Sequence, residues 1–151
     1  IEAILNSRPL SPLTSDPEDV SALTPAHFLI GKKLIALPEL NVLDIPEGRL
    51  RRFQRMQAMV QQHWTRWQRE YLSELQVRTK WRQTSQQRLK IGTLVLIRND
   101  NLCTLNWQLG RITSIHPDKD QVIQVVGVKV RGGEVTRAVN RICALPIEES
   151  E

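Results

Sequence analysis

The chain has 151 residues, enough for one modest core or for one small domain with connecting elements, and short for two full domains. Two cysteines far apart in the sequence and three histidines exclude a disulfide framework and a paired zinc motif, and they favour a reduced intracellular compartment. The formal charge is +5, and no apolar run approaches the roughly 18 residues that a membrane span needs.

The charge is segregated along the chain. Residues 1–46 hold three basic and six acidic residues, whereas residues 47–82 hold nine basic and three acidic ones. Residues 83–151 hold nine basic and seven acidic residues, three of the acids lying in a tail over 148–151. A basic middle and a basic C-terminal region suggest a polyanionic partner, and the alternative on charge alone is a solvated, arginine-rich helix face.

The first 46 residues are predicted to be a helix end followed by a connector. The chain opens on Ile1 in an apolar, helix-like stretch, so we expect the natural start to lie upstream. Residues 1–10 predict the last turns of a helix that stops before Pro9. Five prolines between residues 11 and 46 predict an extended connector that wraps rather than packs, with one helical turn over 24–30 capped by Thr24.

A long amphipathic helix is predicted over residues 47–82. Apolar residues recur there at steps of three and four without an interior Gly or Pro: Leu50, Phe53, Met56, Val60, Trp64, Trp67, Tyr71 and Leu75. The opposite face carries arginines: Arg49, Arg51, Arg52, Arg55, Arg66 and Arg69. The spacing favours packing of the aromatic residues over base stacking, and the stripe needs a partner, either the chain's own domain or a second chain.

Residues 83–147 are predicted to form a small five-stranded β-barrel. The pattern changes to period two with β-branched residues, which predicts strands over 92–97, 107–116, 122–130 and 135–139, with turns over 116–120 and 131–134. A brief strand or 3₁₀ turn over 141–146 would close it. These dimensions are typical of an SH3-like barrel, so the fold class expected is α+β.

No complete catalytic or metal site is predicted. Glu2 is the acid most open to a catalytic interpretation, but the other acids of residues 1–46 lie in loop-like stretches, whereas a two-metal phosphoryl-transfer site needs several carboxylates on rigid elements. The three histidines are not spaced as ligands, and no nucleotide fingerprint is present. We expect no cofactor, and none of these residues is assigned catalysis.

Several segments, in order, resemble BEL/Pao-type retrotransposon integrases. Residues 91–97, 107–112 and 137–146 look like the C-terminal domain of that family. ILNSRPL at residues 4–10, LTPAHFLIG at residues 23–31 and the Trp64-Thr65-Arg66-Trp67 series that runs on to Lys80-Trp81 are similar to segments upstream of it. The similarity covers nearly the whole chain, and ordered agreement of this kind is more specific than any one motif.

The resemblance implies a non-catalytic C-terminal fragment of an integrase or Pol polyprotein. Residues 1–46 would then be the truncated end of a ribonuclease-H-like catalytic core, whose carboxylates and zinc-binding region lie upstream. The implied function is DNA binding in support of DNA integration, and the implied location is nuclear when the chain is part of the parent integrase. Cations on strands and turns would contact phosphates without reading bases, and we expect the strongest contributions from Arg111, Lys129, Arg131 and Arg137, with Arg51, Arg52 and Arg55 assisting from the helix.

Two other functions remain open from the sequence. In the first, the long helix mainly assembles integrase subunits, and the barrel has a structural role. A Tudor- or chromo-like reader of methylated histone tails uses a similar barrel, but its cage needs two to four aromatic residues. Residues 83–151 contain one aromatic residue, Trp107, which we interpret as a core or rim residue of the barrel.

Overall fold

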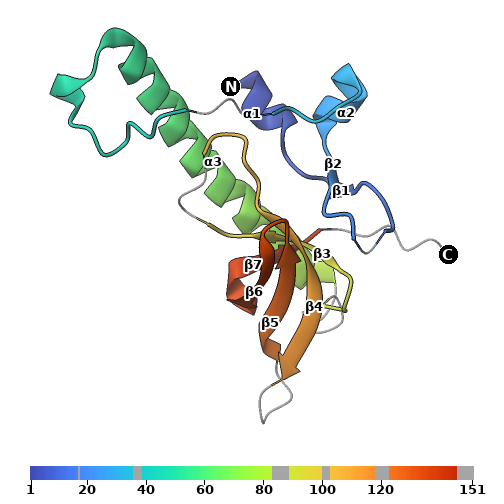
Figure 1. Ribbon diagram of the computed structural model, residues 1–151. Coiled ribbons are helices and arrows are strands. Elements are labelled where there is room, and N and C mark those ends of the chain that lie inside the picture. Colours follow the sequence, from blue (N-terminus) through green and yellow to red (C-terminus); the bar gives the residue numbers. More distant parts are fainter. Residues whose placement is uncertain (17, 36–38, 83–88, 100–102, 118–122, 146–151) are drawn as a thin grey trace.

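The computed structural model describes residues 1–16, 18–35, 39–82, 89–99, 103–117 and 123–145 (Figure 1). Residues 83–88 at the start of the predicted barrel region, most of the predicted turn over 116–120 and the acidic tail lie outside these residues. Before the sheet the chain forms α1 (Glu2–Asn6), β1 (Ser11–Pro12), β2 (Ala22–Leu23), α2 (Pro25–Ile30), a 3₁₀ turn (Glu47–Arg49) and α3 (Arg52–Arg82). The sheet that follows contains β3 (Leu94–Ile97), β4 (Leu109–Pro117), β5 (Ile123–Val130), β6 (Gly133–Ala138), a 3₁₀ turn (Val139–Arg141) and β7 (Ile142–Ala144).

The sheet has five antiparallel strands in the order β6-β5-β4-β3-β7, and it is open. Strands β3 to β6 follow one another as neighbours, and β7 returns to pair with β3, with Leu96 opposite Cys143. The predicted closure into a barrel is wrong, because β6 and β7 are the two edges and do not pair with each other. Helix α3 and the segment around Ala22 cover one face of the sheet, and side chains of the strands themselves bury a second apolar cluster on the other face.

Apolar side chains leave β3 toward both faces of the sheet. Leu94 and Leu96 join a cluster with Leu72 of α3 and with Ala22, whereas Val95 and Ile97 join a second cluster on the other face. Successive side chains of a strand point to opposite faces, so a strand covered on both sides is apolar throughout. The β-branched run at 94–97 is therefore the centre of the fold.

Helix α3 packs on the sheet through its second half. The Cys143 thiol lies 3.5 Å from the Leu72 carbonyl oxygen, and burial raises the pKa of this thiol to about 11. The Gln76 side-chain amide donates to the carbonyl oxygens of Asn140 and Ile142, at 3.2 and 3.3 Å. These contacts join the helix to β7 and to the turn before it.

The connector before α3 packs more than the sequence predicted. As expected, α1 ends before Arg8 and Pro9, and α2 begins at Pro25 after Thr24. The Thr24 amide donates to Nδ1 of His27, which closes the first turn of α2. The expectation of a connector that does not pack is wrong for residues 20–23, since β1 pairs with β2 and Ala22 is buried in the core beneath α3.

Candidate nucleic-acid interface

The cations predicted to bind nucleic acid lie in three places: the middle of the sheet, its edge hairpin and the start of α3. Arg111 on β4 and Lys129 on β5 are cross-strand neighbours in the middle of the sheet. Arg131 lies in the turn between β5 and β6, and Arg137 lies on the edge strand β6. Neighbouring strands are about 5 Å apart, so the register places Arg111 and Lys129 side by side. Arg131 and Arg137 lie at the edge of the sheet.

Arg111 is buried, and each of its three guanidinium nitrogens donates a hydrogen bond to a carbonyl oxygen. Its Nε donates to the carbonyl oxygen of Asp19 at 2.7 Å, one terminal nitrogen to Gly92 at 2.9 Å and the other to Thr14 at 3.1 Å. Only 7% of the residue is exposed. We call this arrangement the Arg111 clamp, because it ties the segment that contains Thr14 and Asp19 to the sheet. A guanidinium held by three carbonyl oxygens has little left to offer a phosphate, so we assign Arg111 a structural part.

The same segment reaches the neighbouring cation. Glu18 forms an ion pair with Lys129, and both side chains are partly open to solvent, by 74% and 42%. Exposed pairs of this kind stabilise a fold by about 1 kcal/mol at most. Lys129 can therefore leave Glu18 for a phosphate at little cost, which Arg111 cannot do.

Hydrogen bonds within the clamped segment also fix a carboxylate. Asp19 accepts hydrogen bonds from the Thr14 hydroxyl at 2.8 Å and from the Ser21 amide at 2.9 Å. Hydrogen bonds from Ser21 and Thr14, with a smaller contribution from the charge of Arg111, hold the pKa of the Asp19 carboxyl below its usual value. The Asp19 carboxylate therefore stays charged, while the backbone carbonyl oxygen of Asp19 accepts the hydrogen bond from Arg111.

Arg131 and Arg137 are exposed on the β5–β6 hairpin. Arg137 donates to the Thr136 carbonyl oxygen at 3.0 Å, which leaves most of its donors directed to solvent. Within the ranges that the structure describes, neither arginine forms an ion pair. The hairpin also carries Glu134, which accepts a hydrogen bond from the Thr113 hydroxyl. These two arginines are the predicted residues best placed to meet a polyanion.

The arginines at the start of α3 form a separate group. Arg51, Arg52 and Arg55 are all exposed. From Arg52 to Leu72, where the helix meets the sheet, α3 rises about 30 Å. The structure therefore does not bring the two predicted sets of cations together, and Figure 1 shows the start of α3 extending away from the sheet.

Four aromatic rings form the joint between α3 and the sheet. The ring of Trp107 meets those of Trp64, Trp67 and Tyr71 edge-on, with centroid distances of 5.0, 5.8 and 5.6 Å. Trp107 also donates from Nε1 to the Ser7 hydroxyl oxygen at 3.2 Å. The prediction that these aromatic residues pack is confirmed. The four rings pack against one another rather than surrounding an open space of the kind that holds a cation in a reader's cage.

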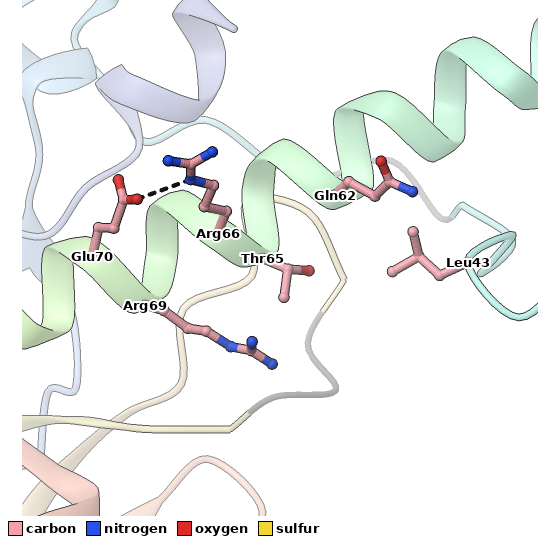
Figure 2. Close-up of a pocket in the computed structure, with 6 residues that line it drawn as sticks. All are labelled: Leu43, Gln62, Thr65, Arg66, Arg69 and Glu70. Atoms are coloured by element: carbon pink, nitrogen blue, oxygen red, sulfur yellow. Dashed lines mark hydrogen bonds and ion pairs between the residues drawn. The ribbon is translucent and has the colours of Figure 1, made fainter.

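An open hollow of about 430 Å³ lies beside the middle of α3 (Figure 2). Leu43 lines it from the preceding loop, and five residues line it from the helix: Gln62, Thr65, Arg66, Arg69 and Glu70. Arg66 and Glu70 form an exposed ion pair at 2.9 Å, marked by the dashed line in Figure 2. A ligand site usually encloses most of its ligand, and this hollow is too open for us to assign one.

The residues that hold the N-terminal segment on the sheet were not found from the sequence. The clamp uses carbonyl oxygens of Thr14, Asp19 and Gly92, which every residue type possesses, so no side-chain pattern could have indicated it. In the parts of the chain that the structure describes, no three acidic, histidine or cysteine side chains gather as metal ligands would. Over the same parts, no helix combines the length and the apolar character needed to cross a bilayer.

The fold and the interface define an α+β chain whose long helix packs on an open antiparallel sheet with exposed cations along one hairpin. Residues 51–145 match the model of DUF5641, a family of unknown function, and the chain belongs to this family. The match covers α3 and the whole sheet. No curated protein and no solved structure is significantly similar to the chain.

Proposed function

We propose that this chain is the non-catalytic C-terminal part of a BEL/Pao-type retrotransposon integrase and that it binds DNA. Two independent features support the proposal. The first is the ordered resemblance of segments from residue 4 to residue 146. The second is the succession of a long helix and a five-stranded antiparallel sheet, which agrees with the linker helix and SH3-like domain that the resemblance implies, although the sheet is open.

The observation that carries the DNA-binding part is the exposure of Arg131 and Arg137 on an edge hairpin. In the described part of the chain no carboxylate pairs with either side chain, so their charge faces solvent. Lys129 adds a third cation once it leaves Glu18. Contacts of this type neutralise phosphates and release counterions without reading bases, so the binding is sensitive to salt rather than to sequence.

The remaining predicted residues take lesser parts in this mechanism. Arg111 positions the N-terminal segment and does not meet DNA. Arg51, Arg52 and Arg55 assist only on a DNA that continues about 30 Å beyond the hairpin. Strand cutting and joining would belong to residues upstream of this chain in the parent integrase, which would act in the nucleus.

Charge reversal on the hairpin tests the proposal. We expect the double variant Arg131→Glu, Arg137→Glu to lose affinity for duplex DNA, and the slope of log K against log salt to become shallower by about two, because each phosphate contact contributes roughly −0.9. Fluorescence anisotropy with a labelled duplex over a salt series measures both quantities. The matched control is Lys32→Glu, Lys33→Glu, which changes the net charge equally at two exposed lysines outside the sheet.

The control separates a local contact from a general effect of charge. If both double variants lose the same affinity and the same slope, the chain attracts DNA only through its net charge, and the hairpin is not the interface. If neither variant changes the affinity at low salt, the chain does not bind DNA through these cations at all.

A further inference from the structure

The first turns of α3 leave an apolar surface uncovered. Phe53 and Met59 are each about two-thirds exposed, at 67% and 66%, and Met56 is 54% and Val60 37% exposed. We call these four side chains the apolar strip. Single exposed apolar residues are ordinary on protein surfaces, but a contiguous group of large ones marks an interaction site.

The chain's own loop covers the other side of these turns. Ala58 packs with Val42 and Leu50, and the Gln61 side chain donates to the Leu40 carbonyl oxygen at 2.8 Å and accepts from the Val42 amide at 3.1 Å. At about 100° per residue, the side of Ala58 and Gln61 lies roughly opposite the centre of the apolar strip. Among the residues that the structure describes, the fold therefore covers one side of the helix and leaves the strip exposed.

Cations border the strip along one edge. Arg52 and Arg55 lie on either side of Met59 around the helix axis, whereas the other border is formed by the half-buried, uncharged Gln54 and Gln57. Arg49 and Arg51 add two more exposed cations just before the helix. Cations at a helix N-terminus oppose the helix dipole, so the helix itself gains nothing from this arrangement.

The combination of strip and cations selects one kind of occupant. Duplex DNA would meet the arginines and leave Phe53 and Met56 in water. Two copies of the chain packed strip to strip would bring their arginines together. The strip of one copy could instead meet the more acidic second half of α3 in another copy, but Trp67 and Tyr71 already contact Trp107 there. A bilayer binds in proportion to the apolar area buried, and four side chains over about 10 Å of helix offer little.

We propose that the start of α3 docks an acidic protein partner. The apolar strip lies against an apolar face of the partner, and Arg52 and Arg55 pair with carboxylates along one rim of that face. Apolar side chains in the centre supply most of the affinity, and the charged border sets orientation and partner choice. This interaction does not depend on DNA binding by the β5–β6 hairpin, and a DNA long enough to reach Arg52 and Arg55 would compete with the partner for these two side chains.

A designed peptide serves as the probe. It is an amphipathic helix with leucines along one face and glutamates on both borders, whose mutual repulsion keeps it monomeric. The full 151-residue chain is expected to bind it saturably in isothermal titration calorimetry. Replacing its glutamates by lysines should abolish binding, because the borders would then repel Arg52 and Arg55.

Variants of the chain locate the interaction. We expect Phe53→Ser, Met56→Ser and, separately, Arg52→Glu, Arg55→Glu each to weaken peptide binding by about tenfold or more. The matched controls are Phe28→Ser, Leu29→Ser, at two equally exposed apolar residues on α2, and the Lys32→Glu, Lys33→Glu pair. Arg131→Glu, Arg137→Glu should bind the peptide as the unchanged chain does, which separates this proposal from DNA binding.

Each other outcome overturns the proposal. Absence of peptide binding, or binding that the strip variants leave unchanged, removes the docking surface. Equal binding of polyglutamate reduces it to charge alone. Dependence of DNA binding or of anionic-vesicle binding on Phe53 and Met56 assigns the strip to those ligands. Dimerisation in light scattering that Phe53→Ser abolishes assigns it to a second copy. Circular dichroism checks that the exposed substitutions leave the fold intact.

Discussion

Over residues 52–76, the two halves of α3, 52–63 and 64–76, have the same periodic pattern and opposite surroundings. In the first half, Phe53 is 67% exposed, whereas in the second half Trp64 is 1% exposed. Both lie in the stripe that recurs at steps of three and four. The difference arises outside the helix. The second half meets the sheet and Trp107, whereas in the described part of the chain the first half packs against the loop that carries Val42.

The contrast shows what helical periodicity can and cannot predict. It identifies the face of a helix that is rich in apolar groups. It does not identify which part of that face the rest of the chain will cover, since coverage depends on contacts distant in sequence, such as that between Trp64 and Trp107. An amphipathic face that extends beyond its own domain is therefore a surface available to a partner.

The largest expected difference in stability is between alanine substitutions at Trp64 and at Phe53. Trp64→Ala should lower the free energy of unfolding by about 3–5 kcal/mol, because it removes a buried ring from the joint with Trp67 and Trp107. Phe53→Ala should change it by about 0.5 kcal/mol or less, since the ring is already in water. Urea unfolding followed by circular dichroism measures both values.

A milder variant keeps this comparison usable if Trp64→Ala does not fold. Trp64→Phe removes part of the ring and should lose about half as much stability. Equal losses at Trp64 and Phe53 would contradict the difference between the two halves, because they would mean that the first half is also covered in solution.

Arg111 and Lys129, neighbours in the sheet, differ in the same way, because Arg111 is covered by the N-terminal segment and Lys129 is partly exposed. Arg111→Met should cost about 2–3 kcal/mol, because it leaves the carbonyl oxygens of Thr14, Asp19 and Gly92 without their donor while keeping the apolar stem. Lys129→Met should cost about 0.5 kcal/mol or less, since its pair with Glu18 is exposed. Urea unfolding gives the two costs.

Limited proteolysis adds a local readout to the clamp experiment. Cleavage near residues 14–19 should accelerate in Arg111→Met and stay slow in Lys129→Met. If the two variants lose equal stability and are cut at equal rates, the clamp does not hold the N-terminal segment, and Arg111 returns to the cations available for DNA.

Local patterns predicted the elements of this fold, and distant contacts escaped them. The run at 94–97, the turn around Gly133 and the capping of α2 at Thr24 each depend on a few neighbouring residues, and all were found. The open sheet, the burial of Ala22 and the clamp on Arg111 depend on pairs about 50 to 100 residues apart, such as Leu96 with Cys143 and Arg111 with Asp19. Of the candidate interface, the sequence predicted Arg131 and Arg137 as exposed cations but could not separate them from the buried Arg111.

The smallest expected effect concerns the tie between the second half of α3 and the N-terminal segment. Tyr71→Phe removes the hydrogen bond from the phenol to the Pro9 carbonyl oxygen and keeps the ring stacked on Trp67, at a centroid distance of 5.4 Å. We expect a loss of about 1 kcal/mol in urea unfolding.

Ser7→Ala removes the neighbouring hydrogen bond from Trp107 to the Ser7 hydroxyl oxygen. Because both ties hold residues 7–9, their losses should be less than additive in the double variant. Full additivity would contradict this coupling, because it would mean that Tyr71 and Ser7 hold the segment at two independent points.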